Sequence, residues 1–268
     1  MSEIPSLLLV GCGRMGGAML AGWRERGLDA SFAVDPAPNA ARNAGTDLTV
    51  VSTLSSVPAA FSPAAVVLAV KPQSAAEVLP AYARFASSAV FLSIMAGRTI
   101  GGIQALLGGS AAIVRAMPNT PAAVRQGVTV ATPSASVTSG QRTLCENLLR
   151  AIGLVEWVER EDLLDPVTAV SGSGPAYVFL LAELMERAAI EQGIAPDLAR
   201  VLARQTVAGS GALLAASSET AAELRTAVTS PGGTTEAALK VLMARDALPK
   251  ALSEAIAAAT RRSRELAG

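Results

Sequence analysis

The chain has 268 residues, of which 51% are hydrophobic and 16% are charged, and its formal net charge at neutral pH is +0. This composition is typical of a folded globular protein, and the balanced charge argues against nucleic acid or an anionic membrane surface as a partner. The sequence contains 0 histidines, which excludes a Ser-His-Asp hydrolase, a histidine general base and a histidine-rich metal site, and we expect no metal.

The first half of the chain alternates short apolar runs with segments of helical spacing. The apolar runs predict strands at Leu7–Val10, Phe32–Val34, Leu48–Val51, Ala65–Val70, Ala89–Ile94 and Ala112–Ala116. Helices are predicted at Met15–Arg26, Ser74–Phe85, Thr99–Leu107 and Ser139–Ala151. Because strands that are nearly continuous in Val, Leu and Ala are usually buried on both faces, this pattern predicts an α/β domain over residues 1–160 with a doubly wound parallel sheet of the Rossmann type.

The pattern changes after Trp157, and no strand is predicted from Asp162 to Gly268. Segments rich in Ala and Leu predict helices at Pro175–Gln192, Pro196–Ala216, Ala221–Val228, Thr235–Ala244 and Pro249–Leu266. Apolar residues cover more than one face of these helices, and the region is too small to bury them all internally. We therefore expect residues 161–268 to form an all-helical domain that makes the interface of a homodimer. An Ala-rich bundle from a composition-biased genome is the alternative.

A glycine motif follows the first predicted strand. It consists of Gly11, Cys12, Gly13, Arg14, Met15 and Gly16. The motif matches G-x-G-x-x-G and opens a helical segment, which is the context of a dinucleotide-binding fingerprint. Gly11 would permit the tight turn, Gly13 would let the backbone approach the pyrophosphate, and Gly16 would let helix and sheet pack closely. The N–H groups at the start of the helix would face the phosphates, so we predict dinucleotide binding here.

Asp35 stands at the end of the second predicted strand. An acidic residue at this place can accept a hydrogen bond from the ribose 2′-hydroxyl and would repel a 2′-phosphate, which favours NADH over NADPH. Two alternatives stay open. The pair Asp35-Pro36 could be only a turn starter, and Arg42 could reach a phosphate.

The ends of the other parallel strands should meet at the same rim, where ligands of open α/β sheets bind. The candidate residues there are Ala69, Val70, Lys71, Pro72, Ala96, Gly97, Pro118 and Asn119. Lys71, one of three lysines, points to where a coenzyme or an anionic substrate would lie, although it could also be a solvated residue at a strand end. The small residues Ala96 and Gly97 would leave room for a nicotinamide ring.

Two loops of small residues in the helical part, Ser171–Tyr177 and Ser230–Glu236, are each predicted to start a helix. Each could bind a carboxylate through the N–H groups of the helix start, or could act only as a cap. Together with the glycine motif, the AVKP segment at Ala69–Pro72 and the MPNTP segment at Met117–Pro121, these loops resemble the pyrroline-5-carboxylate reductase family. The resemblance runs in order through the whole chain.

The resemblance implies that NADPH or NADH reduces (S)-1-pyrroline-5-carboxylate to L-proline, the last step of proline biosynthesis. It implies a homodimer through the helical domain, often built into larger rings. The substrate carboxylate would meet Ser230, Gly233, Thr234 and Thr235, and the Thr235 hydroxyl would lie near the ring nitrogen. Thr235 would position the substrate first and relay a proton second. Lys71 is a second candidate catalytic residue, and Asn119 is a candidate substrate contact.

The family commonly carries a His-Pro pair shortly before the second loop, and this sequence does not. A glutamate near that place would approach the substrate amine, so Glu219 is the first candidate and Glu223 the second, with a solvated acid at a helix start as the alternative. A reductase of a related cyclic imine and a non-catalytic nucleotide sensor are the competing functions. With two cysteines, no recognisable targeting segment and no membrane-length apolar run, we expect a cytoplasmic protein.

Overall fold

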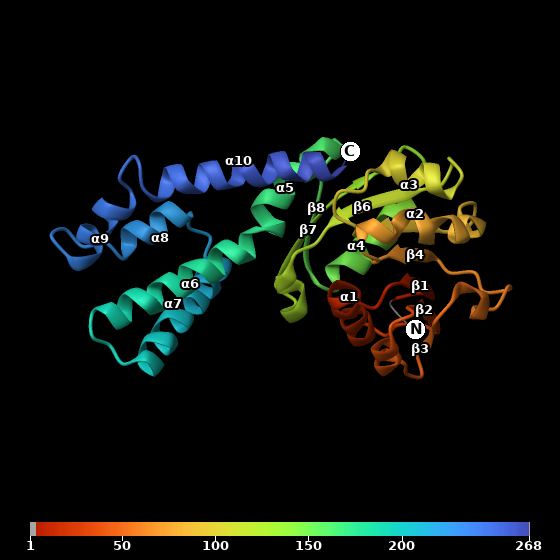
Figure 1. The fold of residues 1–268 in the computed structure, drawn as a ribbon, viewed down its shortest axis with the longest axis horizontal. Coiled ribbons are helices and arrows are strands. Elements are labelled where there is room, and N and C mark those ends of the chain that lie inside the picture. The colour runs from red at the N-terminus through yellow and green to blue at the C-terminus, as the bar shows by residue number, and fades with distance from the viewer. Residues whose placement is uncertain (1–3, 268) are drawn as a thin grey trace. The chain divides into compact units, whose positions relative to one another are not determined.

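The computed structural model describes residues 4–267, and an eight-stranded sheet forms the centre of its first part (Figure 1). The strands are β1 (Leu7–Val10), β2 (Ser31–Val34), β3 (Leu48–Val51), β4 (Ala65–Leu68), β5 (Val90–Ser93), β6 (Ile113–Met117), β7 (Gly127–Pro133) and β8 (Gly153–Trp157). Their order is β3-β2-β1-β4-β5-β6-β7-β8, and the strands from β3 to β6 are parallel. The chain reverses its direction of winding between β1 and β4, so the predicted doubly wound sheet is confirmed.

Strands β7 and β8 were not predicted, and β7 runs antiparallel to β6, so the sheet is not wholly parallel. Both strands alternate in burial instead of forming a continuous apolar run. In β7 the side chain of Thr129 is buried, whereas its neighbours Val128 and Val130 are half-buried. In β8 Leu154 and Glu156 are exposed. A half-buried strand with a polar residue on its inner face leaves a weaker apolar signal than a strand covered on both faces.

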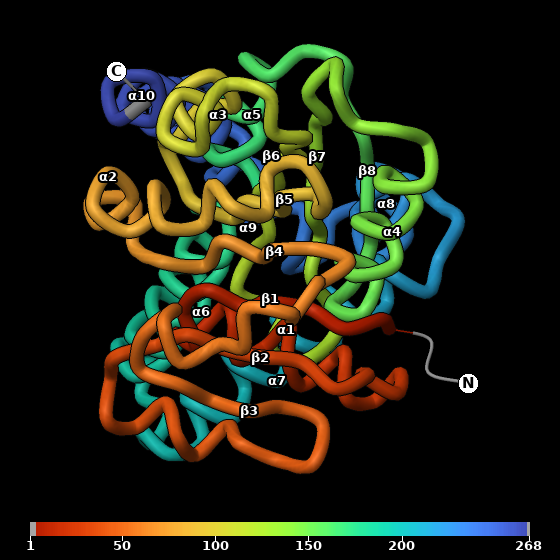
Figure 2. The backbone as a smooth tube through the Cα atoms, turned by 90° about the vertical axis from the view of Figure 1, so that its right-hand side faces the viewer, coloured from red at the N-terminus to blue at the C-terminus, as the bar shows by residue number. Residues whose placement is uncertain are grey.

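Helices cover both faces of the sheet (Figure 2). On one face α1 (Arg14–Glu25) and α4 (Ser139–Arg150) pack on Leu7 and Leu9, and Trp23 Nε1 donates a hydrogen bond to the Leu148 carbonyl at 2.9 Å. On the other face α2 (Ala75–Val78) and α3 (Ile100–Leu107) pack on the alternate residues of the same strands. Both sides of each central strand are therefore buried, which explains the continuous apolar runs in the sequence.

The helix predicted at Ser74–Phe85 is α-helical only over Ala75–Val78 and continues as a 3₁₀ turn over Leu79–Phe85. Pro80 lies at the start of that turn and has no N–H group to donate to the preceding turn of an α-helix.

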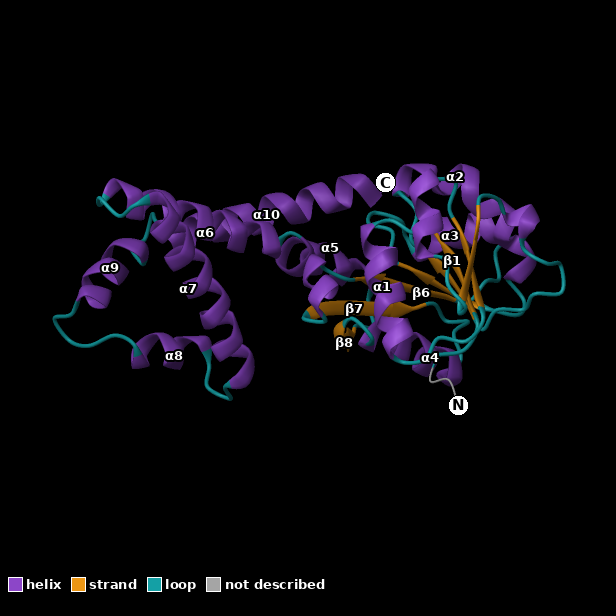
Figure 3. Cartoon of the chain, turned by 90° about the horizontal axis from the view of Figure 1, so that it is seen from below, coloured by secondary structure: helices purple, strands orange, loops and turns teal. Residues whose placement is uncertain are grey.

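The described residues after Trp157 form helices and loops and no strand, as predicted (Figure 3). The helices are α5 (Leu164–Val167), α6 (Gly174–Glu191), α7 (Pro196–Ala216), α8 (Ala221–Ala227), α9 (Thr234–Leu242) and α10 (Leu248–Ala267). The chain divides into two compact units. The first contains the residues up to Gly172 and those from Ala259 onward, and the second contains Ser173–Ala258. The last turns of α10 therefore belong to the same unit as the sheet.

The helix start expected after Ser171 is confirmed, because α6 begins at Gly174 with Pro175 in its first turn, but Ser171 and Gly172 are helical and do not form a loop. A π-helical turn over Thr168–Gly172 leads from α5 towards α6. A Cβ added to Gly172 would lie 2.9 Å from Cε at the end of the Met117 side chain, so this turn packs closely on Met117. The second loop agrees with its prediction, since α9 begins at Thr234 directly after Gly233.

Candidate functional site

The glycine loop between β1 and α1 has the geometry of a phosphate cradle. Gly11 has a φ of 96°, and a Cβ there would lie 2.8 Å from the Ala69 carbonyl oxygen. A Cβ on Gly16 would lie 2.5 Å from the Gly11 carbonyl oxygen, whereas a Cβ on Gly13 would meet nothing within 4 Å. Gly13 is the N-cap of α1 and has no side chain that could accept a hydrogen bond from the first N–H groups of the helix. The first turn also carries no acidic residue. Open space in front of a helix N-terminus of this kind fits a pyrophosphate group.

Asp35 is held against this loop. Its Oδ2 accepts a hydrogen bond from the Cys12 N–H at 2.6 Å, and its Oδ1 accepts one from the Ala37 N–H at 2.9 Å. The second bond is the turn contact that the sequence left as an alternative, so Asp35 does form a turn. The first bond places the carboxylate beside the glycine loop, where a bound adenosine ribose lies in dinucleotide folds.

The Cys12 thiol beside Asp35 is half-buried. Burial, and after it the negative charge of Asp35, raise the pKa of Cys12 to about 11, although the Arg24 charge lowers it. The thiol is therefore protonated and neutral at physiological pH, and it adds no negative charge to a loop that would hold a pyrophosphate.

An arginine clamp that sequence reasoning missed supports the turn after Asp35. Arg24 of α1 contacts Asp47 through Nε and Nη2 at 2.7 Å and 2.9 Å, and its Nη2 also donates to the Asn43 carbonyl at 2.6 Å. The hydrogen bond from Arg24 is the main reason that the pKa of Asp47 is lowered. Arg24 is thus already paired inside the protein. Arg42, in the 3₁₀ turn Pro38–Asn43, is exposed.

The loops that follow β4 and β5 lie at the neighbouring strand ends. Lys71 is exposed and precedes a 3₁₀ turn, Pro72–Ser74. Arg98, which the sequence did not indicate, joins the two loops because its Nε donates to the Pro72 carbonyl at 2.8 Å. Ala96 is exposed, and Gly97 has a φ of 69°. A Cβ on Gly97 would lie 3.0 Å from the Leu266 carbonyl oxygen, so the end of α10 lies against this loop.

Pro118 and Asn119 follow β6, and both are buried. Asn119 Oδ1 accepts a hydrogen bond from the Val128 N–H at 3.0 Å and so fixes the start of β7. The amide oxygen of Asn119 therefore has a structural partner, which leaves the amide nitrogen as the group that could meet a ligand.

The candidate substrate residues Ser230, Gly233, Thr234 and Thr235 lie together in the second unit, at the start of α9. The Gly233 N–H donates to the Ser230 carbonyl at 3.0 Å, and a Cβ on Gly233 would lie 2.5 Å from Ser230 Oγ. Glu236, in the first turn of α9, holds the loop through its Oε2, which accepts a hydrogen bond from the Gly232 N–H at 2.9 Å. The tight loop presents small and hydroxyl side chains at a helix N-terminus.

Glu219 and Glu223 have different surroundings. Glu223 completes a capping box at the start of α8, where its Oε2 accepts from the N–H and the hydroxyl of Thr220, both at 2.7 Å. The backbone hydrogen bond from Thr220 is the main reason that the pKa of Glu223 is lowered. Glu219 lies one residue before that cap, with its N–H bonded to Ser217 Oγ at 3.0 Å. Glu223 already serves its own helix, so Glu219 remains the first candidate for a ligand contact.

Two family matches cover the two parts of the chain. Residues 161–266 match the family described as pyrroline-5-carboxylate reductase dimerisation, and residues 6–97 match the family described as NADP oxidoreductase, coenzyme F420-dependent. A pyrroline-5-carboxylate reductase of Pseudomonas aeruginosa is 37% identical over 98% of this chain and 97% of its own length. The chain belongs to the pyrroline-5-carboxylate reductase family.

Further members of the pyrroline-5-carboxylate reductase family agree with this. The enzyme of Haemophilus influenzae is 36% identical over 97% of both chains. A solved reductase structure from Coxiella burnetii superposes with a TM-score of 0.90 at 34% identity, covering 98% of both chains. A Plasmodium falciparum pyrroline carboxylate reductase with NADP bound superposes with a TM-score of 0.84 at 28% identity, covering 100% of both. The resemblance stated from the sequence and the expected nicotinamide-dependent fold are confirmed.

Proposed function

We propose that this chain is a pyrroline-5-carboxylate reductase that reduces the C=N bond of (S)-1-pyrroline-5-carboxylate with NADPH or NADH and releases L-proline. A complete phosphate cradle around Gly11, Gly13 and Gly16, in a chain that matches the family over nearly its whole length, carries the proposal. The reaction is the last step of proline biosynthesis, and we place it in the cytoplasm.

The residues of the first unit would bind the coenzyme, which supplies the hydride when bound. The glycine loop and the N-terminus of α1 would hold the pyrophosphate, with Asp35 at the ribose. Ala69, Val70, Lys71 and Pro72 would line the middle of the site, and Ala96, Gly97, Pro118 and Asn119 its nicotinamide end. Lys71, an exposed cation, would also attract the substrate carboxylate.

The residues of the second unit would bind the substrate. The loop of Ser230, Gly233 and Thr234 would hold the carboxylate, and the Thr235 hydroxyl would hold the ring nitrogen, with Glu219 near the amine. A cyclic imine is electrophilic without a catalyst, and more so when protonated, so orientation supplies much of the rate. The hydride adds to the imine carbon while the nitrogen takes a proton from water, directly or through Thr235. This chemistry needs no histidine.

The direct test is the loss of NADH or NADPH absorbance when purified protein is mixed with racemic pyrroline-5-carboxylate, with proline measured as the product. We expect Thr235→Ala to lower kcat while the coenzyme Kd changes little, because the hydroxyl contacts the substrate only. Thr226→Ala, which removes a hydroxyl from α8 of the same unit, is the matched control. Unchanged turnover in Thr235→Ala would remove this residue from the mechanism. A folded dimer that oxidises neither coenzyme would favour another cyclic imine or a sensor.

We also propose a preference for NADH. Asp35 carries a negative charge where the 2′-phosphate of NADPH would lie, and Arg24 is engaged by Asp47 and is not available to that phosphate. Asp35→Ser should therefore raise the ratio of NADPH to NADH kcat/KM by about tenfold, as expected for a lost charge repulsion of about 1.4 kcal/mol. Asp29→Ser, at the opposite end of β2, is the control. An unchanged ratio of NADPH to NADH kcat/KM would mean that Asp35 only forms a turn.

The helical unit supports the homodimer. A groove of about 900 Å³ between α6 and α7 is lined by residues that include Val178, Phe179 and Ile190. The helical run Glu161–Glu191 is apolar and long enough to cross a membrane by length and composition alone, but it lies within the match to a dimerisation family, so we assign its apolar surface to a second copy of the chain. Larger rings of dimers are a further part of this proposal.

A further inference from the structure

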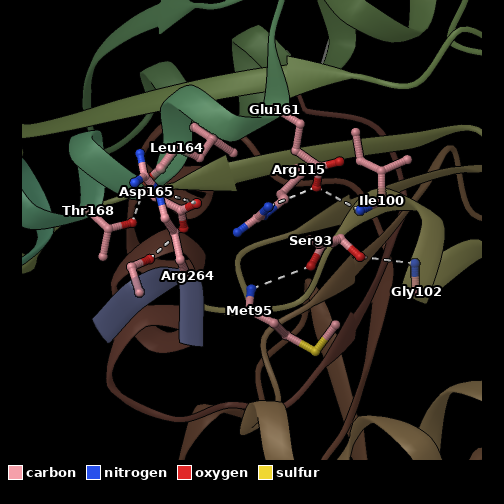
Figure 4. A network of polar contacts seen from close by, with 12 residues as sticks. Ser93, Met95, Ile100, Gly102, Arg115, Glu161, Leu164, Asp165, Thr168 and Arg264 are labelled. Carbon is pink, nitrogen blue, oxygen red and sulfur yellow. Dashed lines mark hydrogen bonds and ion pairs between the residues drawn. The ribbon is translucent and has the colours of Figure 1, made fainter. Parts of the chain in front are cut away.

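A buried arginine lies in the middle of strand β6. The Arg115 residue is 6% exposed, and its Nη1 donates to Glu161 Oε1 at 2.8 Å (Figure 4). The same Oε1 accepts a hydrogen bond from the Ile100 N–H at 2.7 Å, at the first residue of α3. One carboxylate oxygen therefore joins three elements: the sheet, the start of α3, and the first turn of the helical run Glu161–Glu191.

A second carboxylate lies four residues further on, one helical turn away. Asp165 Oδ1 accepts a hydrogen bond from Ser263 Oγ at 2.7 Å, and its Oδ2 lies 4.0 Å from Arg264 Nε. Both partners belong to the last turns of α10, and the Ser263 residue is buried. Asp165 therefore fixes the end of α10 within the first unit.

These two carboxylates hold the loop between β5 and α3 from two sides. Glu161 anchors the residue that follows the loop, Ile100, and the end of α10 lies against Gly97 in its middle through the Leu266 carbonyl. The junction also contains a cavity of about 430 Å³, lined by Thr99, Arg115, Arg160, Glu161, Asp162 and Asp165. The groups that line this pocket are polar, so on this side the loop meets polar contacts, and the Glu161 carboxylate adds to the apolar packing that holds its ends.

We propose that Glu161 and Asp165 are positioning residues that set the place of the Ala96-Gly97 loop at the nicotinamide end of the coenzyme site. The proposal rests on the proposed reductase function. Neither carboxylate needs to touch the substrate or the coenzyme. A displacement of the loop by about 1 Å would be enough to impair hydride transfer by about tenfold to a hundredfold.

The test compares neighbouring carboxylates in the full-length dimer. Glu161→Gln keeps the size of the side chain but leaves Arg115 without a counter-charge, and Asp162→Asn removes the adjacent carboxylate, which pairs with Arg160 at the surface. Ser263→Ala removes one contact of Asp165, with Glu265→Gln, an exposed carboxylate of the same helix, as its control. For each protein we would measure the NADH Kd by calorimetry, kcat with pyrroline-5-carboxylate, the isotope effect with deuterated NADH, and the Tm.

Glu161→Gln should raise the NADH Kd or lower kcat by about tenfold, with an increased isotope effect, while Asp162→Asn stays within about twofold of the wild type. Ser263→Ala should change the NADH Kd, kcat and the isotope effect in the same direction, but by less. If Glu161→Gln does not fold, the result for Ser263→Ala tests the proposal. A lower Tm with wild-type Kd, kcat and isotope effect would overturn the proposal, since the contacts would then only stabilise the fold. The NADH Kd does not require turnover, so a wrong substrate in the proposed function would be recognised separately.

Discussion

Gly13 and Gly16 of the glycine loop lie three positions apart and have opposite surroundings. Gly16 faces the Gly11 carbonyl so closely that a Cβ would lie 2.5 Å from the oxygen, whereas Gly13 faces open space. Gly13 also has a φ of −66°, which any residue can adopt. Gly16 is therefore required by the fold itself, whereas Gly13 is required only by what the loop binds.

The two alanine variants should separate these requirements. Gly16→Ala should lower the free energy of unfolding by about 2 kcal/mol, because backbone atoms must move apart. Gly13→Ala should lower it by about 1 kcal/mol or less, the usual preference for Gly over Ala at an N-cap, but should weaken NADH binding by about tenfold or more. Urea denaturation and calorimetric titration measure the two effects. Wild-type NADH affinity in Gly13→Ala would mean that the pyrophosphate does not approach this residue.

Site residues that lie together in one short segment could be predicted from the sequence. Contacts between residues far apart in the chain could not. The glycine loop and Asp35 follow strands that are visible as apolar runs, so their common place at the carboxyl edge of the sheet follows from the chain order. The contacts from Arg24 to Asp47, from Arg98 to Pro72 and from Arg115 to Glu161 join residues 23, 26 and 46 positions apart. A charge at such a distance from its partner has no local sequence pattern, so these supports appear only in the folded chain.

At the scale of the elements, the errors have a common cause. Prediction relied on continuous apolar runs and on small residues as breaks. It failed for β7 and β8, where burial alternates, and for Ser171 and Gly172, which were expected in a loop but lie in a π-helical turn. Gly172 illustrates why a glycine is ambiguous in a sequence. Glycine often ends a helix, but here it lies inside a helical turn, and the Met117 side chain packs closely against it.

Helix α8 offers a test with a defined pH dependence. Glu223 caps its first turn, and the pKa of this carboxyl is lowered in the folded protein below the ordinary value of 4.5. Its contribution to stability is therefore complete above that ordinary value and is lost as the pH falls through the lowered folded value. Glu223→Ala should lower the Tm at pH 7, and the difference from the wild type should shrink towards pH 4 and below.

Glu223→Gln is the matched control, because glutamine can also complete a capping box. It should keep most of the Tm at pH 7 and should show a smaller change with pH. Neither variant should alter kcat if Glu219 is the residue that meets the substrate. A large loss of kcat in Glu223→Gln with an unchanged Tm would instead assign the substrate contact to Glu223.

At the scale of the whole molecule, the apolar surface of the helical unit is the feature that a single chain does not explain. Phe179 of α6 is 66% exposed, and Val201 of α7 is 61% exposed. Large apolar side chains exposed on two neighbouring helices are typical of an obligate interface. These residues lie within the match to a dimerisation family over 161–266, and we propose that this surface packs on a second copy of the chain.

Phe179→Glu should therefore weaken the dimer by about a hundredfold or more, because a charge would be buried in the interface. Sedimentation velocity over a range of concentrations measures the change. Val124→Glu is the control, since Val124 is equally exposed, at 68%, but belongs to the first unit. Dimers of wild-type affinity in Phe179→Glu would place the interface elsewhere.

The position of the last turns of α10 has a consequence for how the protein is made. Residues from Ala259 onward belong to the unit that otherwise ends at Gly172, so this unit waits for a segment that the ribosome makes after the whole of Ser173–Ala258. At about 5–20 residues per second, that delay is roughly 4–17 seconds. During it the sheet can form, but Asp165 has neither Ser263 nor Arg264 to bind. In a nascent chain the Ala96-Gly97 loop would therefore be held only from the side of Glu161 until the end of α10 has been made.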